Sequence, residues 1–290
     1  MDAPASGGGL VSAPATAEPA PPSDGQQWWM ATRRQLRFYL RTWRFAGLLV
    51  FVVVVDGAFT AVQIYYGNAA TSVGDYLYNA VGSLATFGVI VGAFMGGDAI
   101  AMDFGSGSGY FMLVLPVRRT VLLLGRYVAA FLATFVLLLV FYAITLSGAA
   151  YFYGVGAIPW TNLALSIGLA ALLALAVLAT AFLFSAFFRS PAVSMLVTIL
   201  VLFLAFTVVD ALLTVTPVEP WFSLLYAGEA VALAFQGQPH LTISYGMGRR
   251  HLAFHTWAPY VWEGAAIMVG YLVVGLLLSL VIYERKESKG

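Results

Sequence analysis

The chain lacks cysteine, and only 9% of its 290 residues are charged. Without cysteine it has no disulfide bond, no thiolate nucleophile and no cysteine-ligated metal site. Soluble domains carry about 25% charged residues, so the composition also excludes an ordinary soluble protein. No segment matches GxxxxGK[ST], the loop that binds nucleotide phosphates in many ATPases. These absences argue against an enzyme, and against ATP hydrolysis by this chain.

Hydrophobic residues make up 61% of the chain, and they are concentrated in long stretches. A helix of about 20 apolar residues crosses the hydrocarbon core of a membrane. We therefore predict an all-α polytopic membrane protein with six transmembrane helices over residues 45–66, 78–97, 121–147, 163–188, 192–215 and 263–283. Pro191 would begin the fifth helix after a tight turn, since proline is tolerated at the start of a helix.

The six-span domain, residues 26–285, is flanked by two tails. Residues 1–25 are rich in proline, glycine and alanine without an apolar block, which predicts a disordered cytoplasmic tail, and residues 286–290 form a cytoplasmic C-terminal tail. Within the domain, residues 26–44 place arginines at three- and four-residue steps beside tryptophan and leucine. This pattern is typical of an amphipathic helix in the membrane interface. A simple positive anchor for the first span is given equal weight.

The basic residues are distributed unevenly about the spans. Of the 14 lysines and arginines, all except Arg249 and Arg250 fall on the side that holds the N-terminus. Because loops rich in lysine and arginine face the cytoplasm, we predict that both termini are cytoplasmic, in the plasma membrane of a prokaryote. The net charge of +1 gives no reason to expect a nucleic-acid partner.

The connection over residues 216–262 is the longest and forms the predicted outer loop. Residues 221–235 are apolar enough for a short helix that lies on the outer surface or dips into the membrane and returns. We favour a cap over an outer exit. His251 and His255 would share one face if their segment were helical, as two metal ligands can. No further ligand accompanies them at a fixed spacing, so we predict no metal site.

Three acidic residues lie within the spans or at their ends. Asp56 lies roughly 18 Å into the membrane by helical rise, whereas Asp210 and Glu263 lie near the outer boundary. A charged group at mid-membrane costs about 2.5–3.5 kcal/mol, so Asp56 should face protein or water. Each acid either lines a pathway or makes a buried hydrogen bond. We weigh the two equally for Asp56 and favour the hydrogen bond for the others.

The second span carries Gly88, Gly92 and Gly96 on one helical face. Glycine allows the close backbone approach that holds membrane helices together. This helix-packing seam predicts either ordinary packing between helices or a tight contact beside a pathway or a second subunit.

The most distinctive segment joins the second and third spans. It reads Asp98-Ala99-Ile100-Ala101-Met102-Asp103-Phe104-Gly105 and continues to Leu115-Pro116-Val117-Arg118-Arg119 and Gly125-Arg126. This segment resembles the type-2 permease family, the transmembrane subunits of ATP-binding-cassette (ABC) exporters of the type V fold. Members join these spans by a cytoplasmic elbow with an acidic residue, Gly-Thr, Pro-Val-x-Arg and Gly-Lys. Asp103 takes the acidic place, and Gly105-Ser106 or Gly107-Ser108 stands for Gly-Thr. Gly125-Arg126 replaces Gly-Lys.

The resemblance implies a mechanism. The permease would form the translocation pathway as a dimer, with an identical or related copy, within membrane lipid. Separate cytosolic ATPase subunits, which hold ATP and magnesium, would bind the cytoplasmic coupling elbow, residues 98–119, and drive export. The implied ATPase-coupling residues are Asp98, Asp103, Gly105, Pro116, Arg118, Arg119 and, in a second turn, Arg189.

Two other functions stay open from the residues alone. An ATP-independent channel or secondary transporter would use Asp56 as a proton or cation site, although the two halves show no inverted repeat. A scaffold subunit of a membrane complex would need none of the acids. Dependence of activity on a cytosolic ATPase distinguishes the permease from both.

Overall fold

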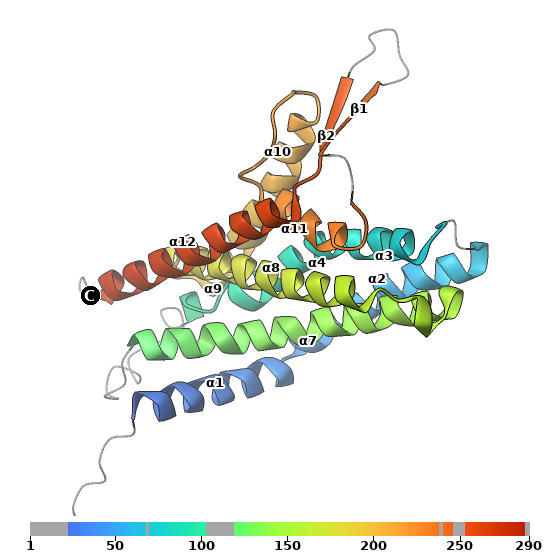
Figure 1. The fold of residues 1–290 in the computed structure, drawn as a ribbon. Helices are drawn as coiled ribbons and strands as arrows, with labels where there is room; N and C mark the ends of the chain where they lie inside the picture. Colours follow the sequence, from blue (N-terminus) through green and yellow to red (C-terminus); the bar gives the residue numbers. More distant parts are fainter. Residues whose placement is uncertain (1–22, 68–69, 103–118, 238–239, 246–252, 288–290) are drawn as a thin grey trace, which may run out of the picture.

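The computed structural model describes residues 23–67, 70–102, 119–237, 240–245 and 253–287. Within these residues, six helical spans are long and apolar enough to cross a membrane. They are Trp43–Tyr66, Val73–Gly96, Thr120–Tyr153, Trp160–Phe187, Pro191–Leu213 and Val261–Arg285. Figure 1 shows the helices gathered in one bundle. The predicted class, a mainly helical polytopic membrane protein with six spans, is confirmed.

Two of the six spans are built from more than one helix. The second span consists of α3 (Val73–Gly82) and α4 (Leu84–Gly96), and the fifth of α9 (Pro191–Ile199), the π-helical segment η2 (Leu200–Ala205) and α10 (Phe206–Leu213). The others are α2 (Trp43–Tyr66), α7 (Arg119–Tyr153), α8 (Trp160–Phe187) and α12 (Val261–Glu287). A π-helical turn inside a helix frequently marks a functional position, so the fifth span differs from the rest.

The predicted amphipathic helix is α1 (Asp24–Arg41), which begins slightly before the expected residue 26. The Ser23 backbone N–H donates to Gln26 Oε1 (3.3 Å), which satisfies a donor at the helix start. Thr32 and Tyr39 are buried. A Cβ added at Gly125 of α7 would lie 3.1 Å from the Ala31 Cβ and 3.3 Å from a backbone oxygen of α1. The close approach of α1 to α7 therefore leaves little room for a side chain at this position.

The seam of Gly88, Gly92 and Gly96 packs against α8 of the same chain. A Cβ added at Gly92 would lie 2.5 Å from Val177 Cγ1, and one added at Gly96 would lie 2.9 Å from the Ala181 Cβ. Helix α12 approaches α8 closely at Gly275, where an added Cβ would lie 2.9 Å from the carbonyl carbon of Ala179. The seam thus packs two helices within the subunit, where dispersion contacts at short range replace the missing hydrophobic drive.

The last connection holds a short helix and a small sheet. Helix α11 (Leu224–Leu233) confirms the helix expected within residues 221–235. Its residues are mostly buried, and it contacts α3, α4, α8 and α12, so it dips into the bundle and does not lie on its surface. Strands β1 (Leu241–Tyr245) and β2 (Ala253–Trp257) form an antiparallel hairpin that projects from the helices (Figure 1).

This hairpin differs from the sequence-based expectation. His255 lies on β2, opposite Ile243 of β1, so the helical conformation that a shared face with His251 would require is not present at His255. His251 itself lies outside the described residues. Threonine, tyrosine and the other aromatic residues of the two strands have high β propensity, a signal from which the hairpin could have been predicted.

The close contact between α4 and α8 generates a prediction. Gly92→Leu should destabilise the protein by about 1–3 kcal/mol, because the added side chain has no room beside Val177. Gly270→Leu in α12 is the matched control, since a Cβ there meets no atom within 4 Å. Both unfolding midpoints would be measured by thermal denaturation in the same detergent. Equal midpoints would contradict the packing described.

Candidate functional site

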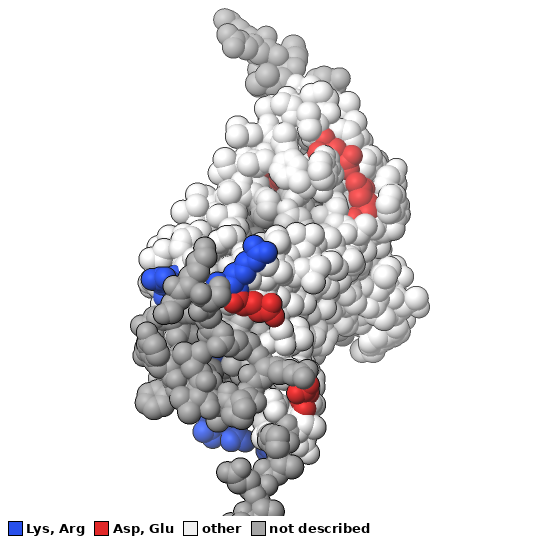
Figure 2. Space-filling model, turned by 90° about the vertical axis from the view of Figure 1, so that its left-hand side faces the viewer, with Lys and Arg blue, Asp and Glu red and all other residues white. Residues whose placement is uncertain are grey.

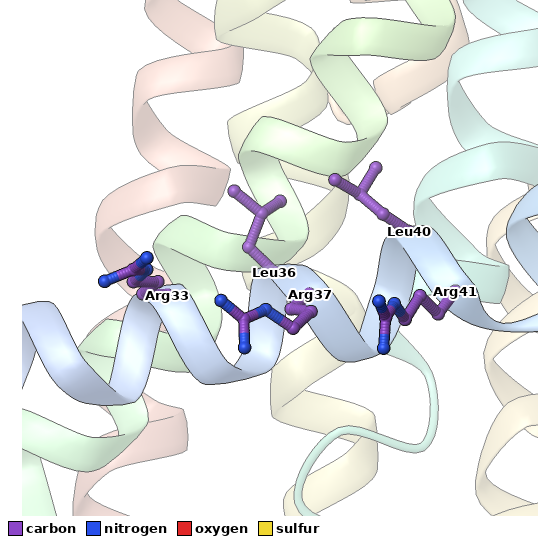
Figure 3. A pocket seen from close by; sticks show the side chains of 5 residues that line it. All are labelled: Arg33, Leu36, Arg37, Leu40 and Arg41. Atoms are coloured by element: carbon purple, nitrogen blue, oxygen red, sulfur yellow. The ribbon is translucent and has the colours of Figure 1, made fainter.

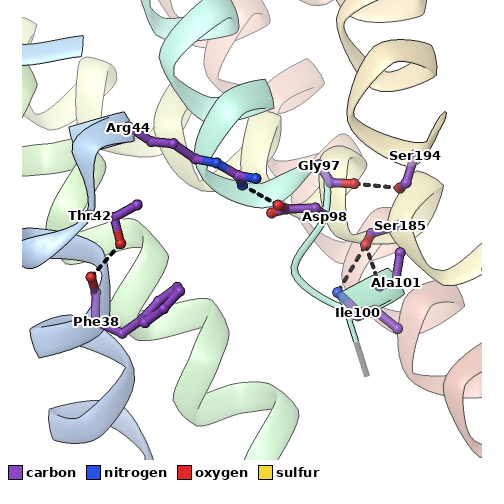
Figure 4. Close-up of polar contacts among 9 residues, drawn as sticks. All are labelled: Phe38, Thr42, Arg44, Gly97, Asp98, Ile100, Ala101, Ser185 and Ser194. Carbon is purple, nitrogen blue, oxygen red and sulfur yellow. Dashed lines mark hydrogen bonds and ion pairs between the residues drawn. The ribbon is translucent and has the colours of Figure 1, made fainter. Parts of the chain in front are cut away.

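The chain leaves the second span in a tightly held turn, residues 97–102, which we call the Asp98 turn. Helix α4 ends at Gly96, and Asp98 follows almost at once. The Asp98 side chain is only 3% exposed and forms an ion pair with Arg44, at the start of α2, whose side chain is 49% exposed (Figure 4). A buried carboxylate needs such a partner, because loss of hydration costs several kcal/mol per ion.

The backbone of the Asp98 turn is held by two buried serines from other spans. Ser185, near the end of α8, accepts from the backbone N–H groups of Ile100 (2.9 Å) and Ala101 (3.0 Å). Ser194, in the first turns of α9, donates to the carbonyl oxygen of Gly97 (Figure 4). The Ser194 bond satisfies a carbonyl group that the end of α4 leaves unpaired, and the three bonds connect the second span directly to the fourth and fifth.

Helix α7 supplies a further contact to the same turn. The Arg126 guanidinium, which is 8% exposed, donates to the carbonyl oxygen of Ala99 (3.3 Å). The Asp98 turn therefore bonds to α2, α7, α8 and α9. A Cβ at Gly97 would lie 3.1 Å from the Met195 Cα and 2.5 Å from a carbonyl oxygen of α4, so only glycine fits at that approach.

Tyr39 of α1 covers this region from the side. It is 8% exposed. Burial raises the pKa of Tyr39 to about 12, and the charge of Asp98 adds to the shift. The hydroxyl therefore stays neutral at physiological pH, so α1 places an uncharged side chain near Asp98.

The predicted coupling residues have different placements. Asp98 lies in the turn just described, and Arg119 is the first residue of α7. Arg189 is exposed in the turn between α8 and α9. Asp103, Gly105, Pro116 and Arg118 lie outside the described residues. The structure thus brings Asp98 and the α8–α9 turn to the same end of the bundle, since Ser185 and Ser194 on either side of that turn both contact residues 97–101.

Sequence reasoning missed Ser185, Ser194 and Arg44 as parts of this site. The two serines flank the Arg189 turn and are the kind of polar residue that bridges membrane helices, which was a usable signal. Arg44 was treated only as a member of the basic stripe, because no pattern in a single sequence pairs it with a residue 54 positions away.

Helix α1 adds a basic surface at this end of the molecule. Figure 2 views the molecule from that end and shows basic side chains there, with acidic ones beside them. A shallow, open hollow of about 310 Å³ runs along α1 and is lined by Arg33, Leu36, Arg37, Leu40 and Arg41, whose side chains are drawn in Figure 3. A hollow lined by guanidinium and leucine side chains suits a ligand with an anionic head and an apolar tail.

The three acids singled out in the sequence lie at separate places. Asp56 is 3% exposed between α2 and α7, where Thr145 Oγ1 donates to its carboxylate (3.3 and 3.4 Å). Asp210 of α10 accepts from Ser223 Oγ (2.6 Å). Glu263 lies in the first turn of α12 and accepts from the Tyr260 backbone N–H (3.2 Å). Each therefore accepts a hydrogen bond, and whether any of them also lines a pathway stays a prediction.

The unequal exposure of Arg44 and Asp98 generates a prediction. Arg44→Met should cost about 3 kcal/mol of unfolding free energy, because it leaves a buried carboxylate without its partner. Asp98→Asn should cost only about 1 kcal/mol, because the half-exposed Arg44 can be hydrated. The double variant should regain part of the loss seen in Arg44→Met.

These free energies would be measured by SDS titration of the protein in mixed micelles. Arg37→Met is the control, since Arg37 is exposed on α1 and its loss should change little. The prediction is contradicted if Asp98→Asn loses more unfolding free energy than Arg44→Met. The burial of the Asp98 charge would then not be the reason that the ion pair stabilises the protein.

Comparison with known proteins agrees with this geometry. The family model described as ABC-2 family transporter protein matches residues 29–288, a range that includes all six spans and the Asp98 turn. No curated protein matches the chain significantly. Because the match covers nearly the whole chain, the chain belongs to the ABC-2 transporter family and is a multi-pass transmembrane permease component.

Proposed function

We propose that this chain is the permease subunit of an ABC exporter, driven by separate ATPase subunits. The observation that carries the proposal is the Asp98 turn, where one short segment bonds to α2, α7, α8 and α9. Buried polar contacts in a low-dielectric interior are strong and costly to break. A force applied to the elbow would therefore reach several spans together.

In this mechanism the ATPase subunits, with ATP and magnesium bound, dock on the elbow, residues 98–119, and on the exposed turn at Arg189. Their closure displaces Gly97, and the hydrogen bond from Ser194 carries the displacement into α9. The π-helical segment η2 follows α9 directly and gives the fifth span a place to change its winding. Packed helices switch between discrete arrangements, so a small displacement opens the pathway outward.

Charge supports the proposed orientation. Arg44, which follows the arginines of α1, pairs with Asp98, and Arg189 lies between Ser185 and Ser194, which bond to the same Asp98 turn. Basic residues at one end of a membrane bundle indicate the cytoplasmic side. Both termini would then be cytoplasmic, in a prokaryotic plasma membrane. The hollow beside Arg33 and Arg37 would hold an anionic lipid headgroup.

The exposed faces of the spans support a dimer. Helices α2 and α12 and the fifth span leave many apolar side chains exposed, among them Val54, Leu204 and Leu277. Lipid covers part of such a surface, and a second permease, identical or related, would cover the rest. The translocation pathway would lie along that shared interface.

The geometry around Asp56 does not favour the ATP-independent alternative. Its carboxylate lies between two helices and accepts from Thr145, as expected of a buried hydrogen bond that stabilises helix packing. A proton or cation site would need access that this contact does not provide, so the ATPase-driven function is the better supported one.

The proposal predicts what copurifies with the chain. The tagged protein, extracted from its native host in mild detergent, should carry a near-stoichiometric ATPase with a phosphate-binding loop, identified by mass spectrometry. Reversing both elbow charges, Asp103→Arg with Arg118→Glu, should remove that ATPase because the docking charges no longer match.

Arg285→Glu provides the control, since it reverses a charge at the same end but outside the elbow. Both variants should reach the membrane at wild-type level. If the chain purifies alone and moves ions across liposome membranes without ATP, the exporter proposal is wrong. If the ATPase is retained after the elbow reversal, the docking site lies elsewhere.

A further inference from the structure

Three metal-ligating side chains meet at the start of α12, away from the Asp98 turn. Glu219 comes from the segment between α10 and α11, His240 precedes β1, and Glu263 lies in the first turn of α12. One potential ligand atom of each lies within 4.8 Å of the other two, and all three residues are half-buried. Among the described residues, this is the one such group of three.

The orientation of His240 leaves one ring nitrogen available. Its Nδ1 lies 2.8 Å from the carbonyl oxygen of Ala258. A carbonyl only accepts, so Nδ1 donates to it, and the second ring nitrogen, Nε2, faces Glu219 Oε2 at 3.7 Å. Metal-bound histidines are commonly held in this way, with the second nitrogen donating to a carbonyl or carboxylate.

Aromatic rings fix the position of the imidazole. The His240 ring stacks on Tyr260 with centroids 4.7 Å apart, and the Trp257 ring meets it edge-on at 5.3 Å. A ring held on two sides and hydrogen-bonded on a third loses little further freedom on binding a ligand. The nitrogen is therefore preorganised.

Both carboxylates are also oriented by neighbours. Tyr226 Oη donates to Glu219 Oε1 (2.6 Å), and the Tyr260 backbone N–H donates to Glu263 Oε2 (3.2 Å). The two carboxyl groups also lie within hydrogen-bond distance of each other. The two acidic side chains lie side by side in a half-buried place, and a bound divalent cation would neutralise the charge that they carry when ionised.

We propose that Glu219, His240 and Glu263 bind a divalent transition-metal ion such as Zn²⁺, with water as the fourth ligand. Three atoms within 4.8 Å of one another fit around a point roughly 2.8 Å or less from each, so shifts of less than about 1 Å reach the 2.0–2.1 Å of zinc coordination. The imidazole selects against Ca²⁺ and Mg²⁺, which prefer oxygen ligands.

The ion would connect three parts of the chain that are far apart in sequence. It would tie the segment before α11 and the base of the β1–β2 hairpin to the first turn of the last span. This inference goes beyond the proposed function and does not depend on it, since the site lies at a different place from the elbow. Its role is to hold this connection in a fixed position on the last span.

The test measures zinc binding directly, with a tag that contains no histidine. The full chain, purified in detergent and stripped with EDTA, is dialysed against Zn²⁺, and bound metal is quantified by mass spectrometry. We expect one Zn²⁺ per chain, a rise in the thermal unfolding midpoint, and a visible absorption band of a nitrogen- and oxygen-ligated Co²⁺ when cobalt replaces zinc. His240→Ala and Glu219→Gln should each weaken binding by at least about tenfold.

His255→Ala is the matched control, because His255 lies on the neighbouring strand β2 and outside the group. It should bind zinc as the wild type does. The proposal is overturned if the wild type binds no zinc, or if His255→Ala loses binding as His240→Ala does. It is also overturned if Glu219→Gln lowers the unfolding midpoint while zinc binding is unchanged, because the three side chains would then form only a hydrogen-bonded cluster.

Discussion

A carboxylate buried at the end of a membrane helix must be compensated, and in this protein the compensation of Asp98 decides the local structure. Arg44 supplies the charge from the start of the first span. The surrounding backbone is satisfied by Ser185, Ser194 and Arg126, each from a different helix. Because an unpaired group there would cost more than any one of these contacts contributes, the ends of five spans are fixed relative to one another. The proposed coupling function uses that fixed arrangement.

A second constraint on the structure is the close packing of its helices at small residues. Membrane helices lack a hydrophobic drive toward one another, so α8 is held by glycine and alanine contacts, including those at Gly92 and Gly96. Contacts at this distance leave no space for gradual sliding. Displacement of the elbow should therefore move α4 and α8 as one unit, while the π-helical part of the fifth span changes its winding. In the proposed outward-opening motion, the closely packed helices α4 and α8 move together and the π-helical part of the fifth span deforms.

The sequence predicted some of this well. Long apolar runs define spans with little ambiguity, so all six were found, and α11 was expected from its apolar composition. Pairings across the chain were not predictable, because nothing in one sequence relates Arg44 to Asp98 or Glu219 to Glu263. The β1–β2 hairpin was not predicted, although the threonines and aromatic residues of its strands favour β structure. Four of the implied coupling residues, Asp103, Gly105, Pro116 and Arg118, lie outside the described residues, so their roles stay predictions.

Hydrogen–deuterium exchange on the permease in complex with its ATPase tests the central claim most directly. The complex would be compared without nucleotide and with ATP trapped by vanadate. The amides of Ile100 and Ala101 are bonded to Ser185 and should stay protected in both states, because the Asp98 turn moves as a unit. Exchange should change in the fifth span, around residues 200–205. A change in protection at Ile100 and Ala101, with none in the fifth span, would contradict the account.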